Sequence, residues 1–218
     1  IVLDDGEPEI VAATLAVVDR RALAHGAARA PEERVDHWLA YRNDTSGLQA
    51  LTKKGFVIDT MEVAAPWSKL TEVYAGVVAA TSSVSGARSV SAHVSHSYLD
   101  GACIYFTFVG QLSSRDINDA TTAEHEQLYL EMWNAAQRAA LSAGANLAHH
   151  HGVGLNRGRF MREAMGDAFN ALTALKQALD PHDLFNPGKL GLATRRGAMP
   201  WSIGTTTSEH DNKNGGTT

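Results

Sequence analysis

The sequence predicts an α+β fold, with a ferredoxin-like antiparallel sheet, helices on one face of that sheet and a helical C-terminal extension. Three features predict it. Residues 56–64 alternate and are rich in Val, Ile and Thr, which is typical of a strand. Residues 90–98 and 102–109 are two more strand-like segments, and Leu99-Asp100-Gly101 between them is a typical hairpin connection. Residues 121–143 instead repeat apolar side chains at helical spacing.

The N-terminal elements follow in chain order. Ile1-Val2-Leu3 is predicted to be a short apolar strand. Residues 7–25 have helical spacing and end at Gly26. Residues 31–41 begin with Pro-Glu-Glu, which suits a first helical turn because proline lacks the donor and acids favour that end. Residues 42–47 are a loop by composition.

The remaining helices and turns are also marked by their ends. A helix opens at Pro66-Trp67-Ser68 and runs to about residue 80, before a Ser/Gly-rich turn over residues 82–88. The long helix over 121–143 stops at Gly144. Two more helices are predicted over 156–165 and 167–179, and the second ends at Asp180-Pro181.

These elements predict three regions. Residues 1–147 form a ferredoxin-like domain, residues 148–192 a helical extension, and residues 193–218 a disordered tail, whose last stretch is polar and Thr/Gly-rich. The chain opens at Ile1 rather than Met, directly in a predicted strand, so we expect a segment of a longer polypeptide.

Composition excludes some classes of function. The formal net charge of −5 argues against nucleic acid as the partner, because a phosphate-binding surface is usually basic. The single cysteine, Cys103, cannot form an internal disulfide. No apolar run approaches the ~20 residues needed to cross a bilayer. Acidic residues crowd the N-terminus where a secretory signal would be basic, so we expect a cytoplasmic protein.

The segment from His149 to Gly154, HHHGVG, is the most informative one. Three adjacent histidines cannot share one face of a helix or strand, so they are not a simple zinc pair, and no metal site is predicted. Gly152 and Gly154 allow the backbone to approach a flat ligand, and histidine moves protons near neutral pH. The alternative is a chance cluster at the end of a strand.

Tyr105 lies in the middle of the second hairpin strand. Alternation places Cys103, Tyr105 and Thr107 on one face and Ile104, Phe106 and Phe108 on the other, which is the candidate core face. Tyr105 could therefore serve as an acid or base, although a strand tyrosine is more often a packing residue.

The first hairpin strand carries His93 on one face and His96 on the other by simple alternation. Either could point into a site beside Tyr105, and periodicity does not choose between them. Arg157 follows the histidines and could hold an anionic group, or belong to a solvated helix face.

These segments resemble the C-terminal domain of the FAD-linked oxidases of the vanillyl-alcohol-oxidase superfamily. The ending from Asp180 to Leu190, DPHDLFNPGKL, is similar to the usual ending of that group. GACIYF over residues 101–106, HHHGVG over residues 149–154 and EVAAPW over residues 62–67 look most like the alkyldihydroxyacetonephosphate synthase branch. The resemblance covers residues 1 to about 192.

The resemblance implies the following chemistry. An N-terminal domain of the same polypeptide, not present here, holds FAD, and this segment caps it, so the segment alone is expected to be inactive. The enzyme exchanges the acyl group of acyl-dihydroxyacetone phosphate for a fatty alcohol without net redox, and the flavin acts as a covalent trap through its N5. A small-molecule or lipid-like substrate and a homodimer are the other expected partners.

The resemblance also implies roles for individual residues. Tyr105 is the proton donor and acceptor, and His149, His150 and His151 are catalytic residues that line the flavin and substrate site. His151, Gly152 and Asn186 are the expected cofactor-binding residues. The expected substrate-binding residues are Arg42, His93, His96 and Arg157.

One position departs from the family pattern. Counting back from Trp67 without gaps places Leu48 where the family has its substrate-phosphate arginine. Leucine cannot pair with a phosphate, and Arg42 would have to substitute. The alternative function is therefore an FAD-linked oxidoreductase of the D-2-hydroxy-acid dehydrogenase or oxidase type. Those dehydrogenases usually have a metal-binding Gly-Asp-Gly-Asn-x-His stretch, which this sequence lacks. A third hypothesis is a non-catalytic binding module.

Overall fold

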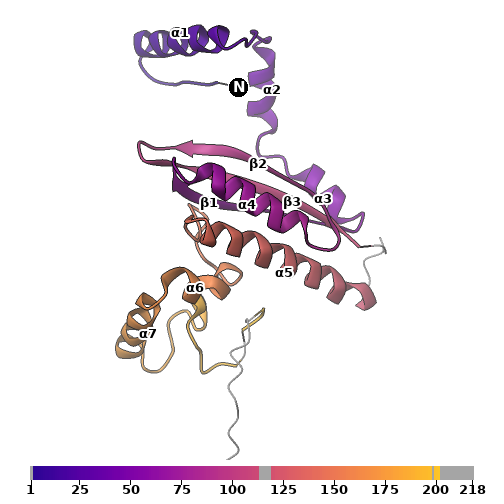
Figure 1. Cartoon of the computed structure of the whole chain (residues 1–218), viewed down its shortest axis with the longest axis vertical. Coiled ribbons are helices and arrows are strands. Elements are labelled where there is room, and N and C mark those ends of the chain that lie inside the picture. Colours follow the sequence, from indigo (N-terminus) through magenta and orange to yellow (C-terminus); the bar gives the residue numbers. More distant parts are fainter. Residues whose placement is uncertain (1, 113–118, 198, 202–218) are drawn as a thin grey trace, which may run out of the picture. The chain divides into compact units, whose positions relative to one another are not determined.

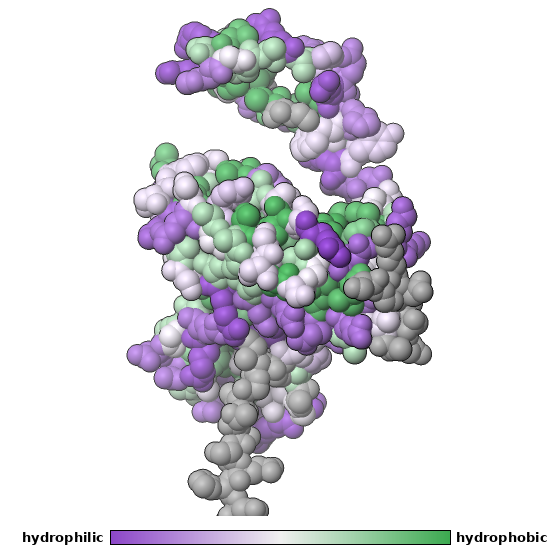
Figure 2. Space-filling view, turned by 45° about the vertical axis from the view of Figure 1, so that its right-hand side comes forward, coloured by the Kyte–Doolittle hydropathy of each residue, from purple (hydrophilic) through white to green (hydrophobic). Residues whose placement is uncertain are grey.

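The computed structural model describes residues 2–112, 119–197 and 199–201, and the chain forms two compact units, Ile1–Ala50 and Leu51–Thr218. The first unit contains α1 (Pro8–Ala24) and α2 (Glu33–Tyr41), and α3 (Ser46–Thr52) spans the boundary (Figure 1). None of these helices has a buried residue. Their apolar side chains lie at the surface among hydrophilic ones (Figure 2).

The second unit is built on a three-stranded antiparallel sheet in the order β1-β3-β2. Its elements are β1 (Phe56–Pro66), α4 (Leu70–Ser82), β2 (Ala87–Ser97), β3 (Gly101–Gln111) and α5 (Asp119–Ser142). This order is that of a ferredoxin-like split βαβ unit up to its second helix, so the predicted α+β fold is confirmed.

The main core lies between the sheet and the helices α4 and α5. Ile104, Phe106 and Phe108 of β3 are buried in it, as the predicted alternation requires. Val73 and Val77 of α4 and Met132, Trp133 and Ala136 of α5 are buried in the same cluster. A Cβ built on Gly110 would lie 2.9 Å from the Met132 side chain, so a glycine lets α5 pack closely on the sheet.

The C-terminal part of this unit has a small core of its own. Its elements are the 3₁₀ turns η1 (Arg157–Phe160) and η2 (Lys189–Gly191) and the helices α6 (Met161–Met165) and α7 (Ala168–Leu179). Leu147, Phe160, Met161 and Phe169 are buried together. This is the helical extension expected from the sequence; the predicted limits at residues 147 and 192 stay predictions.

Three local expectations need correction or fall outside the described residues. Val2 and Leu3 are not in a strand, since apolar residues make one only when a neighbouring strand pairs with them. Ile1 and much of the predicted tail lie outside the described residues. The loop expected over 42–47 is shorter, because α3 begins at Ser46. In the described part of the chain, no helix is long and apolar enough to cross a membrane.

Candidate active site

A row of polar side chains crosses the face of the sheet that α4 and α5 leave open. Tyr105 on β3 is directly opposite Glu62 on β1 and His93 on β2. Directly opposite residues of an antiparallel pair point to the same side. The His93 and Tyr105 rings are stacked with 5.3 Å between their centroids. The register alone therefore brings a carboxylate, a phenol and an imidazole together.

The loop after α5 covers this row, and the first residues of the loop are bonded to β1. Asn146 pairs with the backbone of Ala64, donating its N–H (2.9 Å) and accepting the Ala64 N–H on its side-chain oxygen (2.7 Å). The His149 N–H then donates to Glu62 (3.0 Å). His150, Gly152 and Gly154 all have positive φ. These reversals let three consecutive histidines point to different partners.

A hydrogen-bonded chain runs from Tyr105 into the interior. The Tyr105 hydroxyl lies 3.1 Å from His151 Nε2, and His151 Nδ1 lies 2.9 Å from a Glu62 oxygen. A carboxylate only accepts, so Nδ1 carries the ring proton and Nε2 accepts from the Tyr105 hydroxyl. Glu62 is fully buried and also forms an ion pair with Arg157, whose side chain is 11% exposed. This buried carboxylate therefore fixes both the orientation and the tautomer of His151.

The protonation of the phenol is set by its surroundings. Burial raises the pKa of Tyr105, Cys103 and Glu62 raise it further, and Arg157 opposes them. Tyr105 is thus a neutral proton donor at neutral pH. Burial also raises the pKa of the Cys103 thiol to about 11, so Cys103 carries no charge there.

A second group of rings lies beside the first. The Tyr98 hydroxyl is 3.0 Å from His149 Nε2, and the His150 ring is 4.5 Å from the His96 ring. Burial lowers the pKa of His149, and the neighbouring His150 and His96 lower it further. His149 is therefore a neutral imidazole at neutral pH.

A bulge brings both strand histidines to the site. Between Val94 and Ser97 strand β2 advances three residues while β3 advances two, from Ile104 to Ala102. The extra residue reverses the alternation, so the expectation that His93 and His96 face opposite sides is wrong. His93 stacks on Tyr105, and a ring nitrogen of His96 lies within 4.8 Å of the Cys103 sulfur.

Three more residues were predicted to belong to the site, namely Arg42, Arg157 and Asn186. Arg157 faces Glu62, and its guanidinium lies 5.1 Å from the centroid of the Trp133 ring. Arg42 belongs to the first unit, where it lies over the Trp38 ring. The cofactor role of Asn186 and the substrate roles of both arginines stay predictions.

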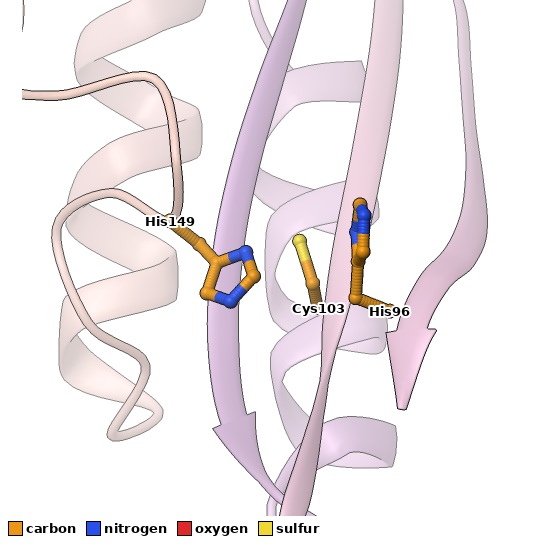
Figure 3. A group of neighbouring side chains, drawn as sticks. All are labelled: His96, Cys103 and His149. Atoms are coloured by element: carbon orange, nitrogen blue, oxygen red, sulfur yellow. The ribbon is translucent and has the colours of Figure 1, made fainter. Parts of the chain in front are cut away.

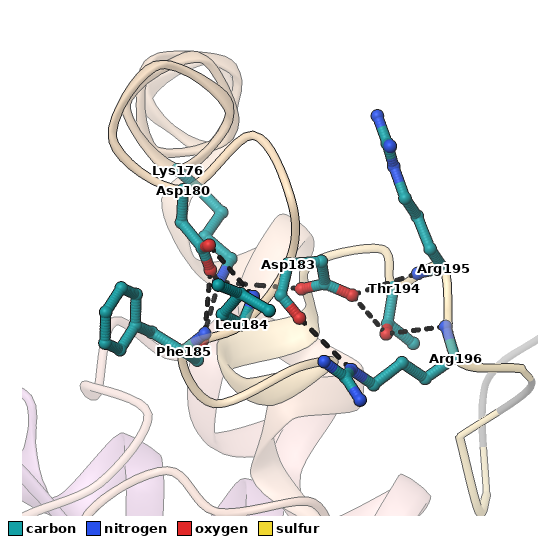
Figure 4. Close-up of polar contacts among 8 residues, drawn as sticks. All are labelled: Lys176, Asp180, Asp183, Leu184, Phe185, Thr194, Arg195 and Arg196. Carbon is teal, nitrogen blue, oxygen red and sulfur yellow. Dashed lines mark hydrogen bonds and ion pairs between the residues drawn. The ribbon is translucent and has the colours of Figure 1, made fainter.

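Asn186 directly follows Phe185 in the C-terminal loop after α7. Two carboxylates hold this loop (Figure 4). Asp180 accepts the N–H groups of Leu184 and Phe185, both at 2.9 Å, and the Lys176 ammonium at 2.5 Å. Asp183 accepts the Thr194 hydroxyl at 2.6 Å and the Arg195 N–H at 3.0 Å. The loop that presents Asn186 is therefore ordered by its own acids.

Reasoning from the residues did not single out Glu62, nor Tyr98, which bonds to His149. Met61 and Val63 are buried in the core, so alternation along β1 points the Glu62 side chain to the other face of the sheet. A lone acid between apolar residues in the middle of a strand is a signal for a paired, buried carboxylate. That signal was present in the sequence, but its partners on the loop were not visible.

Comparisons with known proteins identify the family of the chain. A sequence model of the family "FAD linked oxidases, C-terminal domain" matches residues 1–190. An alkyldihydroxyacetonephosphate synthase of Trypanosoma brucei brucei is 35% identical over 102 residues, 46% of this chain and 15% of that protein. One of Dictyostelium discoideum is 34% identical over 102 residues, with the same two coverages of 46% and 15%.

A longer match is to the "Uncharacterized FAD-linked oxidoreductase YgcU" of Escherichia coli O157:H7, 25% identical over 206 residues. It covers 87% of this chain and 40% of that protein. The chain therefore spans less than half the length of each of these relatives. Because the family match extends over most of its residues, the chain belongs to the C-terminal domain family of the FAD-linked oxidases, enzymes whose cofactor is FAD.

Proposed function

We propose that this chain is the substrate side of an FAD-dependent enzyme of the alkyldihydroxyacetonephosphate synthase type, in which Tyr105 transfers a proton. The observation that carries the proposal is the chain Tyr105–His151–Glu62, with contacts of 3.1 and 2.9 Å. A tyrosine with a raised pKa needs a neighbouring base to give up its proton, and His151, whose Nε2 faces the hydroxyl and whose Nδ1 is held by Glu62, can be that base. Two synthases among the relatives support this class of reaction.

The proton has a defined path in this reaction. Formation of an ether bond from a fatty alcohol releases the alcohol proton. Tyr105 can take it while passing its own hydroxyl proton to His151 Nε2, and Glu62 stabilises the imidazolium that forms. The exchange breaks the bond between the dihydroxyacetone carbon and the acyl carboxylate oxygen, and it is balanced when one proton passes back through Tyr105 to that carboxylate. On the protein side, Tyr105, His151 and Glu62 each lie within hydrogen-bond distance of the next.

The residues around the hydrogen-bonded chain Tyr105–His151–Glu62 fit a flavin. A Cβ built on Gly152 or on Gly154 would meet no atom within 4 Å, so the backbone there is bare and a flat ring can approach. The nearby His149, His150 and His151 can stack on such a ring or bond to its edge. FAD, when bound, supplies the covalent or redox chemistry. We place His151, Gly152 and Asn186 against it, and the FAD domain in the same polypeptide.

An FAD-linked oxidoreductase is the second candidate. One observation favours it: the match to YgcU covers 87% of the chain, against 46% for the Trypanosoma synthase. The ungapped count from Trp67, which puts Leu48 where the family has its phosphate arginine, is an expectation in the same direction. In that reaction Tyr105 and His151 would take the proton of a substrate hydroxyl while the flavin is reduced. His93 and His96 are proposed to contact the substrate in either case.

Anaerobic mixing of the full-length flavoprotein with substrates separates the two candidates. Acyl-dihydroxyacetone phosphate with a fatty alcohol should give an ether product and leave the flavin oxidised. Lasting bleaching by a 2-hydroxy acid, reversed by an oxidant, would establish the oxidoreductase and overturn the synthase.

The proton-transfer role has its own test. Tyr105→Phe should lower kcat by about 10²–10⁴-fold with whichever substrate reacts, the usual contribution of a general acid–base group. Tyr74→Phe, at an exposed tyrosine of α4, is the matched control and should retain activity. Full activity of Tyr105→Phe would contradict the proposed role.

A cytoplasmic location and a homodimer belong to the same proposal. The single thiol of the chain is compatible with a reducing compartment. Cell fractionation and light scattering of the full-length protein would test the two statements.

A further inference from the structure

Three side chains that can bind a metal meet on the open face of the sheet, beside the proton-transfer chain. His96, Cys103 and His149 each offer one ligand atom, and the three atoms lie within 4.8 Å of one another. Figure 3 shows the Cys103 side chain between the two imidazole rings. The residues come from β2, β3 and the loop after α5, so the group exists only in the folded chain. Tyr105, His151 and Glu62 are not members of it.

One nitrogen of this group is left without a protein partner. His149 Nδ1 is buried and has no hydrogen-bond partner among the described residues. A buried imidazole nitrogen without a partner is costly, and native structures usually satisfy it with water, an ion or a ligand. The other nitrogen, Nε2, lies 3.0 Å from the Tyr98 hydroxyl. Metal-binding histidines usually donate their second ring N–H in this way, which leaves the first nitrogen free to ligate.

The bulge in β2 also turns His96 toward this group. Without the bulge between Val94 and Ser97, alternation would turn His96 toward the core side of the sheet. With it, His96 lies over Cys103, at the cost of a disrupted ladder near the end of β2. Bulges commonly re-aim a side chain next to a functional site.

We propose that His96, Cys103 and His149 bind a divalent zinc-class metal ion. A thiolate and two imidazoles are borderline-to-soft ligands, which select zinc over magnesium or calcium. Three protein ligands leave a fourth tetrahedral position for water or a substrate oxygen. Binding draws the three atoms closer than 4.8 Å and displaces the proton of the Cys103 thiol.

Zinc binding by the full-length flavoprotein tests the site. The protein is incubated with Zn²⁺ alone, passed through a gel-filtration column and analysed for zinc. We expect stoichiometric zinc, and X-ray absorption should show one Zn–S distance of about 2.3 Å and Zn–N distances of about 2.0–2.1 Å. Zinc that is lost on the column, or bound without a sulfur ligand, would overturn the proposal.

Variants keep the test independent of folding and of catalysis. His96→Gln, at an exposed position, should weaken zinc binding by about 100-fold or more, because loss of an outer-shell partner alone costs about 10–100-fold. Cys103→Ser should remove the sulfur signal. His93→Gln, on the same strand but outside the group, is the matched control and should bind zinc normally. Zinc binding by the Cys103→Ser or the His96→Gln variant that equals binding by the parent protein would show only an adventitious ion and would overturn the proposal.

Discussion

Strand β3 has one face covered by helices and another covered by a loop. On the helix side, Phe106 and Phe108 are fully buried among apolar residues of α4 and α5. On the loop side, Tyr105 contacts His151, and His151 contacts Glu62, which is as fully buried as the two phenylalanines. The two faces use alternate residues of one segment but are stabilised by different interactions.

The interactions on the two faces differ in how strongly they depend on direction. Burial of Phe106 needs only apolar neighbours of the right size, and its contribution is roughly proportional to area. Burial of Glu62 needs specific donors, and it has them in the His149 N–H, the His151 ring and the Arg157 guanidinium. If Glu62 or Arg157 is replaced by a neutral residue, its partner is left as a buried charge without an opposite charge. The loop-covered face therefore depends on more specific contacts than the helix-covered face. We expect activity to be more sensitive to substitutions on the loop-covered face.

The largest effect should come from the helix-covered face. Phe106→Ala should lower the free energy of unfolding by about 3–5 kcal/mol, because it removes a large buried side chain and leaves a cavity. Urea denaturation measures the loss. Phe185→Ala, at a phenylalanine that is 70% exposed, is the matched control and should change stability by less than about 0.5 kcal/mol. Similar losses for the two variants would contradict the assignment of the core.

Substitution of the buried acid tests whether the open face contributes to stability as well. Glu62→Gln should cost about 3 kcal/mol, near the lower end for breaking a buried pair, because the amide oxygen can still accept the His149 N–H. Adding Arg157→Met should recover part of this loss by removing the unpaired guanidinium. A single variant as stable as the parent would show that Glu62 is not a structural anchor.

A smaller effect is expected in the C-terminal loop, where acids also hold the backbone. The pKa of Asp180 is lowered to about 2, chiefly by its hydrogen bond from Lys176 and then by the Leu184 N–H. Its folded pKa lies below the unfolded value of about 3.9, so its contribution is present above about pH 4. It is lost as the pH falls toward 2. Asp180→Asn should flatten the fall of the melting temperature in this window, and an unchanged pH profile would contradict the prediction.

The sequence predicted much of the fold because its signals are local. The strands over 56–64, 90–98 and 102–109, the hairpin turn between the last two and the long helix to Gly144 are all confirmed within a few residues. The apolar face of Ile104, Phe106 and Phe108 followed from alternation alone. Val2 and Leu3 were misassigned because strand propensity does not supply a partner strand.

The candidate site was only partly predictable. The residue types that meet there, histidines and Tyr105, were visible as motifs, but the loop that turns each histidine to a different partner depends on positive φ at His150, Gly152 and Gly154. The face of His96 depended on a bulge that shifts register against β3. A one-residue shift turns each following side chain to the other face of the sheet, and the periodicity of the sequence does not reveal such a shift.

By itself, the sequence determined which residues are apolar, where helices stop and which segment carries the histidines, because these follow from side-chain chemistry and short-range spacing. Only the tertiary structure decided that Glu62, 87 positions before His149, accepts its N–H, and that His96, Cys103 and His149 converge. The physical reason is that such contacts are fixed by strand register and loop closure, which join residues far apart in the chain.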